Sequence, residues 1–150
     1  MRAVIQRVHR AQITIDGEET RRTGRGLVIF LGVLKGDTRQ QADFLAEKAF
    51  GLRIFPDENG KMNLSLADVA GEALVVSNFT LGTDCKKGRR PSFDMAAPPE
   101  EANALYLRFV EQLRATGTRV ETGEFGAHMD VCVENDGPVT LIIDTEKIGK

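Results

Sequence analysis

The dipeptide Gly137-Pro138 is the segment whose residue types most clearly point to chemistry. It lies between two alternating apolar runs, residues 129–133 and 139–143, where a hairpin turn is expected. Proline directly after a turn glycine is unusual there, because it removes an N–H where the returning strand should begin to pair. A Gly-Pro peptide bond can also be cis at modest cost, which would direct both carbonyl oxygens to one side. The alternative is an ordinary turn that contains a proline.

A second candidate is the polar segment Ser77-Asn78-Phe79-Thr80, which follows the apolar run 73–76. Its serine and threonine hydroxyls could attack an ester carbonyl, but a hydroxyl needs an adjacent base to become a good nucleophile. No histidine or lysine accompanies these residues in a recognised motif. The alternative is that both hydroxyls end the strand by hydrogen bonding to neighbouring backbone.

Four cations stand together in residues 82–99, the longest stretch without hydrophobic periodicity: Lys86, Lys87, Arg89 and Arg90. Such a cluster favours contact with nucleic-acid phosphates, and the alternative is a solvated loop. A net charge of −2 argues against a protein that coats nucleic acid non-specifically. The same charge is compatible with one RNA end held in a locally basic cleft.

Metal, cofactor and membrane chemistry are not expected. His9 and His128 have no second histidine, cysteine or carboxylate at ligand spacing, so no metal site is predicted. Cys85 and Cys132 lie far apart, which fits a reducing compartment. The opening residues do not resemble a signal peptide, and no apolar run reaches membrane-spanning length. We therefore expect a cytoplasmic protein without metal, cofactor or membrane.

Together these segments resemble the D-aminoacyl-tRNA deacylase family, whose signatures are Ser-Gln-x-Thr-Leu and Asn-x-Gly-Pro-x-Thr. Residues 135–140 match the second signature in full. Residues 77–81 match the first, except that Asn78 replaces the glutamine. Three flanking stretches also resemble the family: residues 1–8, residues 52–55 with 60–63, and residues 123–129. Several spaced motifs in one order are far more specific than any single motif.

The resemblance implies an enzyme that hydrolyses the ester bond of D-aminoacyl-tRNA, and of glycine mischarged on tRNA-Ala. Family members are homodimers that bind the 3′ end of aminoacyl-tRNA. In the dimer, Gly137-Pro138 would be cis and enter the active site of the partner subunit. Its carbonyl oxygens would then collide with the side chain of an L-aminoacyl group, so that the L-substrate is rejected. The alternative from another class is a non-enzymatic nucleic-acid-binding homodimer, and a weaker one is a general esterase.

The resemblance also implies roles for single residues. Arg7 matches the arginine that holds the inserted dipeptide, and Phe79 and Met129 match residues that bracket the terminal adenosine. A backbone N–H near Phe79 would stabilise the oxyanion, so that positioning supplies much of the catalysis. The family has two proposals for the attacking step, Thr80 as nucleophile or assistance by the substrate's own 2′-hydroxyl. The missing base favours the 2′-hydroxyl. The alternative for Phe79 and Met129 is packing in the core, and the alternative for Arg7 is a position on the surface. Asn78 is one methylene shorter than the family's glutamine, so a hydrogen bond made by that glutamine side chain would be altered here.

The elements that would position these residues follow from the apolar pattern. With 150 residues, 41% hydrophobic and 28% charged, the chain should form one domain over residues 1–150. A capping box at Asp37 and Gln40 predicts one helix, and Pro99 begins a second that ends at Gly117. Strands are expected at residues 3–8, 11–15, 18–23, 27–31, 73–76, 118–122, 129–134 and 139–143. The predicted fold is α+β, with two main helices packed on a curved, barrel-like antiparallel sheet.

Overall fold

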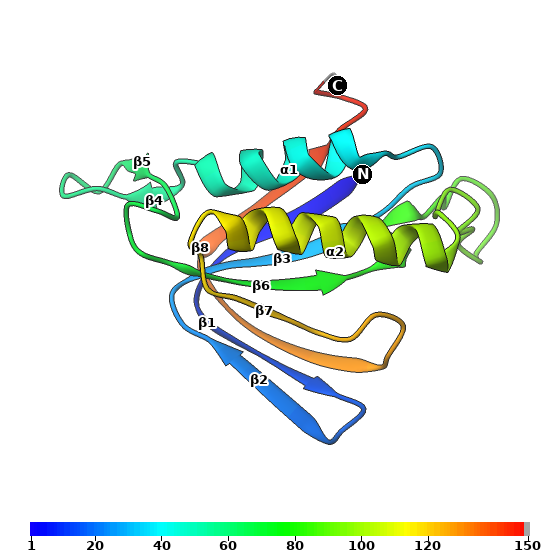
Figure 1. Ribbon diagram of the computed structural model, residues 1–150, viewed down its shortest axis with the longest axis horizontal. Coiled ribbons are helices and arrows are strands. Elements are labelled where there is room, and N and C mark those ends of the chain that lie inside the picture. The colour runs from blue at the N-terminus through cyan, green and yellow to red at the C-terminus, as the bar shows by residue number, and fades with distance from the viewer. Residues whose placement is uncertain (149–150) are drawn as a thin grey trace.

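A strongly curved sheet forms the centre of the computed structural model, which describes residues 1–148. In the described chain, five strands run in the order β2-β1-β3-β6-β7, and β8 also pairs with β1 (Figure 1). The elements of this sheet are β1 (Arg2–Ile15), β2 (Glu19–Thr23), β3 (Gly26–Gly32), β6 (Glu72–Ser77), β7 (Val120–Thr122) and β8 (Met129–Asp144). The remaining elements are α1 (Arg39–Gly51), the hairpin of β4 (Phe55–Pro56) and β5 (Met62–Leu64), the short 3₁₀ helix η1 (Phe79–Gly82) and α2 (Pro99–Ala115).

The sheet is mixed, which corrects the prediction of an antiparallel sheet. β6 pairs in parallel with both β3 and β7. The physical reason is the connection: α1 lies between β3 and β6, and α2 lies between β6 and β7. A helical crossover returns the chain to the end of the sheet where the previous strand began, so the next strand runs the same way. The predicted α+β class, the barrel-like curvature and the two helices are confirmed.

The curvature starts within β1, which the sequence pattern had divided into two strands. Its pairing with β8 shifts register twice, between Gln6 and Val8 and between Val8 and Arg10. At this point the alternation of buried residues changes phase and the strand bends. Ala3 therefore packs beneath the helices, whereas Ile13 belongs to a second apolar cluster inside the curve of the sheet.

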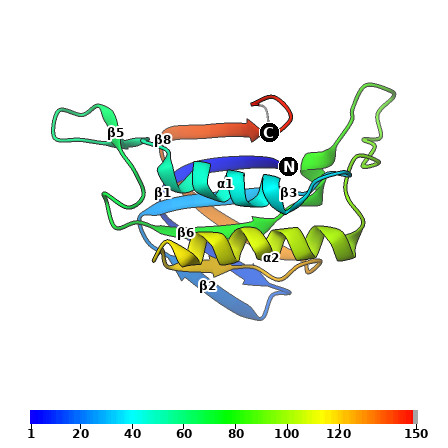
Figure 2. The same cartoon turned by 45° about the horizontal axis from the view of Figure 1, so that its top comes forward.

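Both helices cover the same face of the sheet (Figure 2). The capping box of α1 forms at Thr38 and Gln41, one residue later than predicted. Asp37 instead accepts a hydrogen bond of 2.7 Å from the N–H of Leu34. α2 begins at Pro99 as predicted, and its acidic first turn suits the positive end of the helix dipole. The helices thus cover one face of the sheet that contains β6.

Arginine side chains nearly close the barrel between β2 and β7. Arg21 donates to the carbonyl of Thr122 at 2.7 Å, and Arg119 donates to the carbonyl of Arg22 at 3.3 Å. These side-chain bonds connect β2 and β7, which do not pair with each other through backbone hydrogen bonds. They fix β7, and with it the start of the β7–β8 loop that leads to Met129.

β8 is one continuous strand, and the predicted hairpin at residues 135–138 is wrong. The halves of β8 before and after Gly137-Pro138 do not pair with each other, because both pair with β1. Between them, residues 135–140 of β8 lie opposite only residues 6–8 of β1. The extra residues form a bulge that leaves the ladder and then rejoins it.

Candidate active site

The segment that begins at Ser77 turns sharply at the end of β6. The N–H of Asn78 still bonds to the carbonyl of Leu31 in β3, at 2.9 Å. The side-chain oxygen of Asn78 then accepts hydrogen bonds from the N–H and from the hydroxyl of Thr80, and so caps η1. Asparagine is among the preferred residues for such a cap. Asn78 in this chain therefore shapes the turn.

Phe79 is exposed at the first position of η1. The residue is 58% exposed, and its ring meets the ring of Phe93 edge-on, with centroids 5.3 Å apart. The N–H groups at the start of a helix have no partner within it. Among residues 1–148, no hydrogen bond uses the N–H of Phe79. This N–H is free to bind an oxygen from outside the chain.

Two cavities flank the turn and share one wall, formed by Ser77, Asn78, Phe79, Phe125 and Gly126. The helix-side cavity lies toward α2 and has a volume of about 540 Å³. The barrel-side cavity has a volume of about 340 Å³ and opens toward the β7–β8 loop. Both volumes lie in the usual range for small-molecule sites, about 300–1,000 Å³.

The walls of these cavities are largely apolar and offer few titratable groups. The helix-side cavity includes Tyr106, whose hydroxyl donates to the carbonyl of Val75 at 3.0 Å. Burial raises the pKa of Tyr106 to about 12, so its hydroxyl stays protonated at neutral pH. The barrel-side cavity includes Met129 together with Phe79. The structure thus brings these two predicted residues to one cavity, while Thr80 lines neither of the two.

The predicted basic loop begins and ends beside the helix-side cavity. Asp84 and Ser92 exchange two backbone hydrogen bonds of 2.8 Å, which close the loop at its base. The loop leads directly to Phe93, a wall residue of that cavity. Figure 2 shows the segment between β6 and α2 projecting beyond the ends of the strands. Four exposed cations without an ion pair among the described residues occupy it: Lys86, Lys87, Arg89 and Arg90.

The bulge of β8 holds Gly137-Pro138 in an exposed position. Asn135 closes its base, because its side chain accepts from the N–H of Val139 at 2.8 Å and donates to the carbonyl of Val139 at 3.1 Å. Gly137 has a φ of +152°, and a Cβ there would lie 2.5 Å from the nitrogen of Val139. The Gly137-Pro138 peptide bond is cis, as the resemblance implied. The asparagine and the glycine of this signature therefore shape the bulge.

Arg7 supports the bulge from beneath. Its Nε donates to the carbonyl of Asp136 at 3.1 Å and lies 3.2 Å from the carboxylate of the same residue. Its Nη1 donates to the carbonyl of Ile54 at 2.6 Å. Arg7 is only 8% exposed, so the alternative of a surface position is wrong. The buried guanidinium ties the bulge to the segment before β4.

One chain does not bring the two signatures together. Arg7 lies beside Leu27 in β3, whereas Ser77 lies beside Leu31, four residues further along. With strands about 4.8 Å apart and about 3.3 Å per residue, the dipeptide and Ser77 are about 20 Å apart. Neither cavity beside Ser77 has Gly137 or Pro138 in its wall.

The comparisons with known proteins identify the family. The family model described as D-Tyr-tRNA(Tyr) deacylase matches residues 4–144. The chain belongs to this family. The D-aminoacyl-tRNA deacylase of Thermotoga petrophila is 55% identical over 148 residues, 99% of each chain. That of Symbiobacterium thermophilum is 56% identical over 147 residues, 98% of this chain and 97% of the relative. The prediction of an ester-hydrolysing enzyme of this family is confirmed.

Two solved structures share the deacylase fold. A structure titled c-Myc DNA Unwinding Element Binding Protein superposes with a TM-score of 0.89 at 42% identity and covers 96% of this chain and 98% of its own. A structure of a probable eukaryotic D-amino acid tRNA deacylase superposes with a TM-score of 0.85 and covers 95% of this chain and 97% of its own. Its identity of 20% supports the fold alone.

Several cavity residues of this deacylase were not predicted as site residues. Phe93 and Tyr106 line the helix-side cavity, and Phe125 lines both cavities. Tyr106 and Phe125 also pack against each other, with centroids 6.2 Å apart. Phe93 and Phe125 lie in segments without periodicity, where the sequence gives no sign of which way a ring points. The available signal for both was the resemblance to the family, which included residues 86–93 and residues 123–129.

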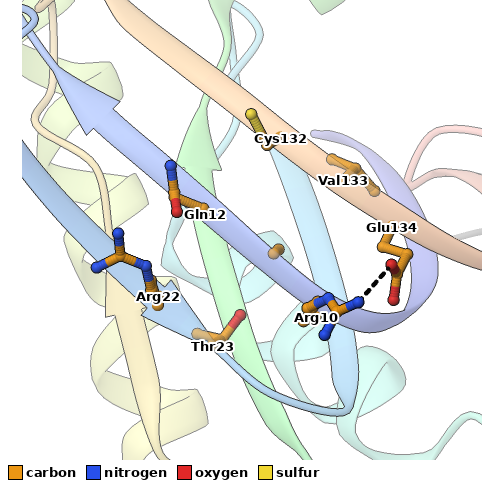
Figure 3. Close-up of a pocket in the computed structure, with 8 residues that line it drawn as sticks. Arg10, Gln12, Arg22, Thr23, Cys132, Val133 and Glu134 are labelled. Carbon is orange, nitrogen blue, oxygen red and sulfur yellow. Dashed lines mark hydrogen bonds and ion pairs between the residues drawn. The ribbon is translucent and has the colours of Figure 1, made fainter.

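A further cavity of about 550 Å³ lies across β2, β1 and β8, and none of the predicted site residues lines it (Figure 3). Figure 3 shows the ion pair of Arg10 and Glu134 at its edge, at 2.9 Å. The described residues contain no cluster of histidine, cysteine and carboxylate side chains suited to a metal ion. No helix within residues 1–148 is both long and apolar enough to cross a membrane.

Proposed function

We propose that this protein hydrolyses the ester bond of D-aminoacyl-tRNA, and of glycine mischarged on tRNA-Ala, and releases the amino acid and the tRNA. The observation that carries the proposal is the family match over residues 4–144, with the Ser77 turn of that family placed beside two cavities. An enzyme with this substrate works where tRNA is charged, in the cytoplasm.

The 3′ end of the tRNA binds at the Ser77 turn. The terminal adenine stacks against Phe79 and Met129, because a nucleobase gains from contact with exposed aromatic and apolar side chains. The phosphates of the acceptor end lie along the basic loop, whose base adjoins the helix-side cavity. Lys86 and its cationic neighbours then contribute affinity without reading a sequence.

Hydrolysis proceeds by attack of water on the ester carbonyl carbon. The bond to the ribose oxygen breaks, and that oxygen takes up a proton as the amino acid leaves. The free N–H of Phe79 stabilises the negative charge that develops on the carbonyl oxygen. The hydroxyl of Thr80 is bonded to the side chain of Asn78 and lines neither cavity, so the 2′-hydroxyl of the substrate is the better candidate to assist the water.

Selection against L-aminoacyl groups comes from a second copy of the chain. The exposed Gly137-Pro138 bulge enters the cavity beside the partner's Ser77 turn, and its carbonyl oxygens leave no space for an L-side chain. The separation of about 20 Å within one chain favours such an arrangement. A two-fold symmetric dimer lets both sites be completed at once.

The second candidate is a nucleic-acid-binding dimer without catalysis. The observation that favours this candidate is the solved structure titled c-Myc DNA Unwinding Element Binding Protein, which is 42% identical to this chain. In the deciding experiment, D-tyrosyl-tRNA and L-tyrosyl-tRNA are incubated separately with a trace amount of protein. We expect many turnovers of the D-substrate while the L-substrate persists. Stoichiometric binding without release of amino acid would overturn the proposal in favour of the binder. Turnover of a simple ester that lacks RNA would favour a general esterase.

A further inference from the structure

The guanidinium of Arg2 joins three separate segments at the end of the sheet that carries the Ser77 turn. Its Nε donates to the Asp144 carboxylate at 2.9 Å, and its Nη1 donates to the carbonyl of Leu81 at 2.9 Å. Arg2 begins β1, Asp144 ends β8, and Leu81 lies within η1. The side chains of Arg2 and Asp144 are 25% and 7% exposed. Charge-assisted bonds in such a partly dry position are the strong ones.

Asp144 is itself held in place. Its second carboxylate oxygen accepts the N–H of Glu146 at 3.0 Å. Burial alone would raise the pKa of the Asp144 carboxyl, but the hydrogen bonds from Arg2 and Glu146 outweigh it and hold the pKa below its usual value. The carboxylate is therefore ionised at neutral pH and fixes the direction of the Arg2 side chain.

The turn needs anchors from outside because its own bonds join only neighbouring residues. Within η1, the N–H of Leu81 reaches the carbonyl of Asn78 only at 3.3 Å. The side-chain bonds of this four-residue 3₁₀ turn are local as well, from Thr80 to Asn78 and from the Thr83 hydroxyl to the carbonyl of Thr80, so they do not fix the turn relative to the strands. Gly32 lets the turn approach β3 closely, since a Cβ there would lie 2.7 Å from the Cβ of Leu81. The contact with β3 places the turn, but it is not directional.

Two directional bonds to strand elements bracket the turn. At its start, the N–H of Asn78 bonds to the carbonyl of Leu31 at 2.9 Å. Near its end, Arg2 binds the carbonyl of Leu81. The free N–H of Phe79 lies between these two points. The orientation of that N–H therefore depends on both anchors.

We infer that Arg2, held by Asp144, is a positioning residue for ester hydrolysis: by fixing the carbonyl of Leu81 it aims the N–H of Phe79 at the oxyanion. This inference rests on the proposed function. It assigns to Arg2 no contact with the substrate. Its loss should therefore lower kcat and leave KM nearly unchanged, because the basic loop and the cavity walls remain. Misplacement of a catalytic group by about 1 Å can cost about a hundredfold in rate.

The test compares Arg2→Lys and Arg2→Met with Arg10→Ala in the full-length protein. Arg10 also lies in β1 and pairs with a carboxylate of β8, Glu134, at 2.9 Å, but it has no hydrogen bond to η1. Single-turnover and steady-state rates on D-tyrosyl-tRNA give kcat and KM, and melting temperatures report folding. Hydrogen exchange of the peptide that covers residues 78–83 reports the rigidity of the turn without any substrate.

We expect Arg2→Met to lower kcat about tenfold to a hundredfold, with KM within about twofold and faster exchange in the turn. Arg2→Lys, which keeps one charge–carbonyl bond, should recover part of kcat, and Arg10→Ala should leave all three measurements unchanged. The inference is overturned if folded Arg2→Met keeps its kcat, if KM rises alone, or if only the melting temperature falls. An inactive parent protein would refute the proposed function instead, and the exchange measurement would then decide alone whether Arg2 anchors the turn.

Discussion

Residues 77–82 lie at the end of a strand beside two cavities, whereas residues 135–140 form a bulge within β8 that exposes Gly137 and Pro138. The first region offers an N–H without a partner among residues 1–148 and cavity walls that are largely apolar. The second region offers an exposed dipeptide, and neither cavity beside Ser77 has this dipeptide in its wall. Each region supplies what the other lacks, and the fold keeps them about 20 Å apart.

The two regions are also held in different ways. The bulge is fixed by side chains within its own signature and by the buried Arg7, so contacts within one chain are enough to shape it. The turn is fixed by distant strand ends, through the carbonyl of Leu31 and the guanidinium of Arg2. Substitutions should therefore separate the regions: changes in the bulge should lower the deacylation rate while tRNA still binds, and changes at the Phe79 ring or the basic loop should weaken tRNA binding.

The largest effect is expected from Gly137→Ala. A Cβ at this position would lie 2.5 Å from the nitrogen of Val139 at a φ of +152°, so the tip of the bulge must move. We expect deacylation of D-tyrosyl-tRNA to fall about a hundredfold or more, with tRNA binding retained. The measurement is kcat/KM beside tRNA affinity.

Gly60→Ala is the matched control for this change. Gly60 also has a positive φ, +77°, in an exposed turn, but nothing lies within 4 Å of its Cβ position. Gly60→Ala should lower the free energy of unfolding by about 1 kcal/mol and leave the deacylation rate unchanged. If Gly137→Ala behaved like Gly60→Ala, the bulge would have no part in the reaction.

A smaller effect is expected from Phe79→Ala. The residue is 58% exposed, so removal of its ring should leave the protein folded, while the terminal adenine loses a stacking partner. Stacking on an aromatic ring contributes about 1–3 kcal/mol per base, so KM should rise about tenfold to a hundredfold. Leu107→Ala removes an apolar side chain that is 53% exposed on α2, outside both cavities, and should not change KM. Equal KM values for Phe79→Ala and Leu107→Ala would show that the terminal adenine does not stack on Phe79.

The basic loop should contribute less than the ring. Replacing Lys86 and Lys87 by alanine removes two phosphate contacts, so KM should rise about threefold to tenfold at low salt, with kcat unchanged. The slope of log affinity against log salt should fall by about 1 to 2. Replacing the exposed Lys48 and Lys147 should alter neither quantity. An unchanged salt slope in the Lys86 and Lys87 variant would leave the loop without a role in tRNA binding.

The smallest effect is expected from Thr80→Ala. The hydroxyl of Thr80 donates to Asn78 and lines neither cavity, so its loss should reduce the single-turnover rate less than about threefold. A loss of several orders of magnitude in a folded variant would make Thr80 the nucleophile. That outcome would place the chemistry in a side chain and not in the backbone of the turn.

The sequence predicted the elements well where the pattern carries the information. Alternation and capping residues placed β3, β6 and α2 within one or two residues, because both reflect local geometry. Alternation gives the face of a residue but not the partner of its strand. For this reason residues 129–133 and 139–143 were predicted as a hairpin, although both pair with β1. For the same reason the sheet was predicted as antiparallel, although β6 pairs in parallel with β3 and β7.

The candidate site was predicted where motifs mark it and missed where only tertiary contacts do. The two signatures located the turn and the bulge, and the structure explains Asn135 and Gly137 by the geometry of the bulge. The anchor from Arg2 to Leu81 joins residues 79 positions apart. The sequence contains no periodic or local signal for such a contact.

In the proposed dimer, each active site uses the turn of one subunit and the bulge of its partner. Ala97 lines the helix-side cavity, so Ala97→Trp should block that cavity, and Gly137→Ala should spoil the bulge. Chains with two different affinity tags are co-expressed, and the heterodimers are purified through both tags. One heterodimer carries the two changes on separate chains, and the other carries both changes on one chain beside an unchanged chain.

The deacylation rate of the two heterodimers on D-tyrosyl-tRNA decides the claim. With the changes on separate chains, one shared site keeps both intact parts, so about half of the unchanged dimer's rate should remain. With both changes on one chain, each shared site has one spoiled part, and the rate should fall to that of the single-variant homodimers. The reverse result, half activity for the unchanged chain beside the double variant and none for the split pair, would show that each subunit works alone and would rule out a shared site.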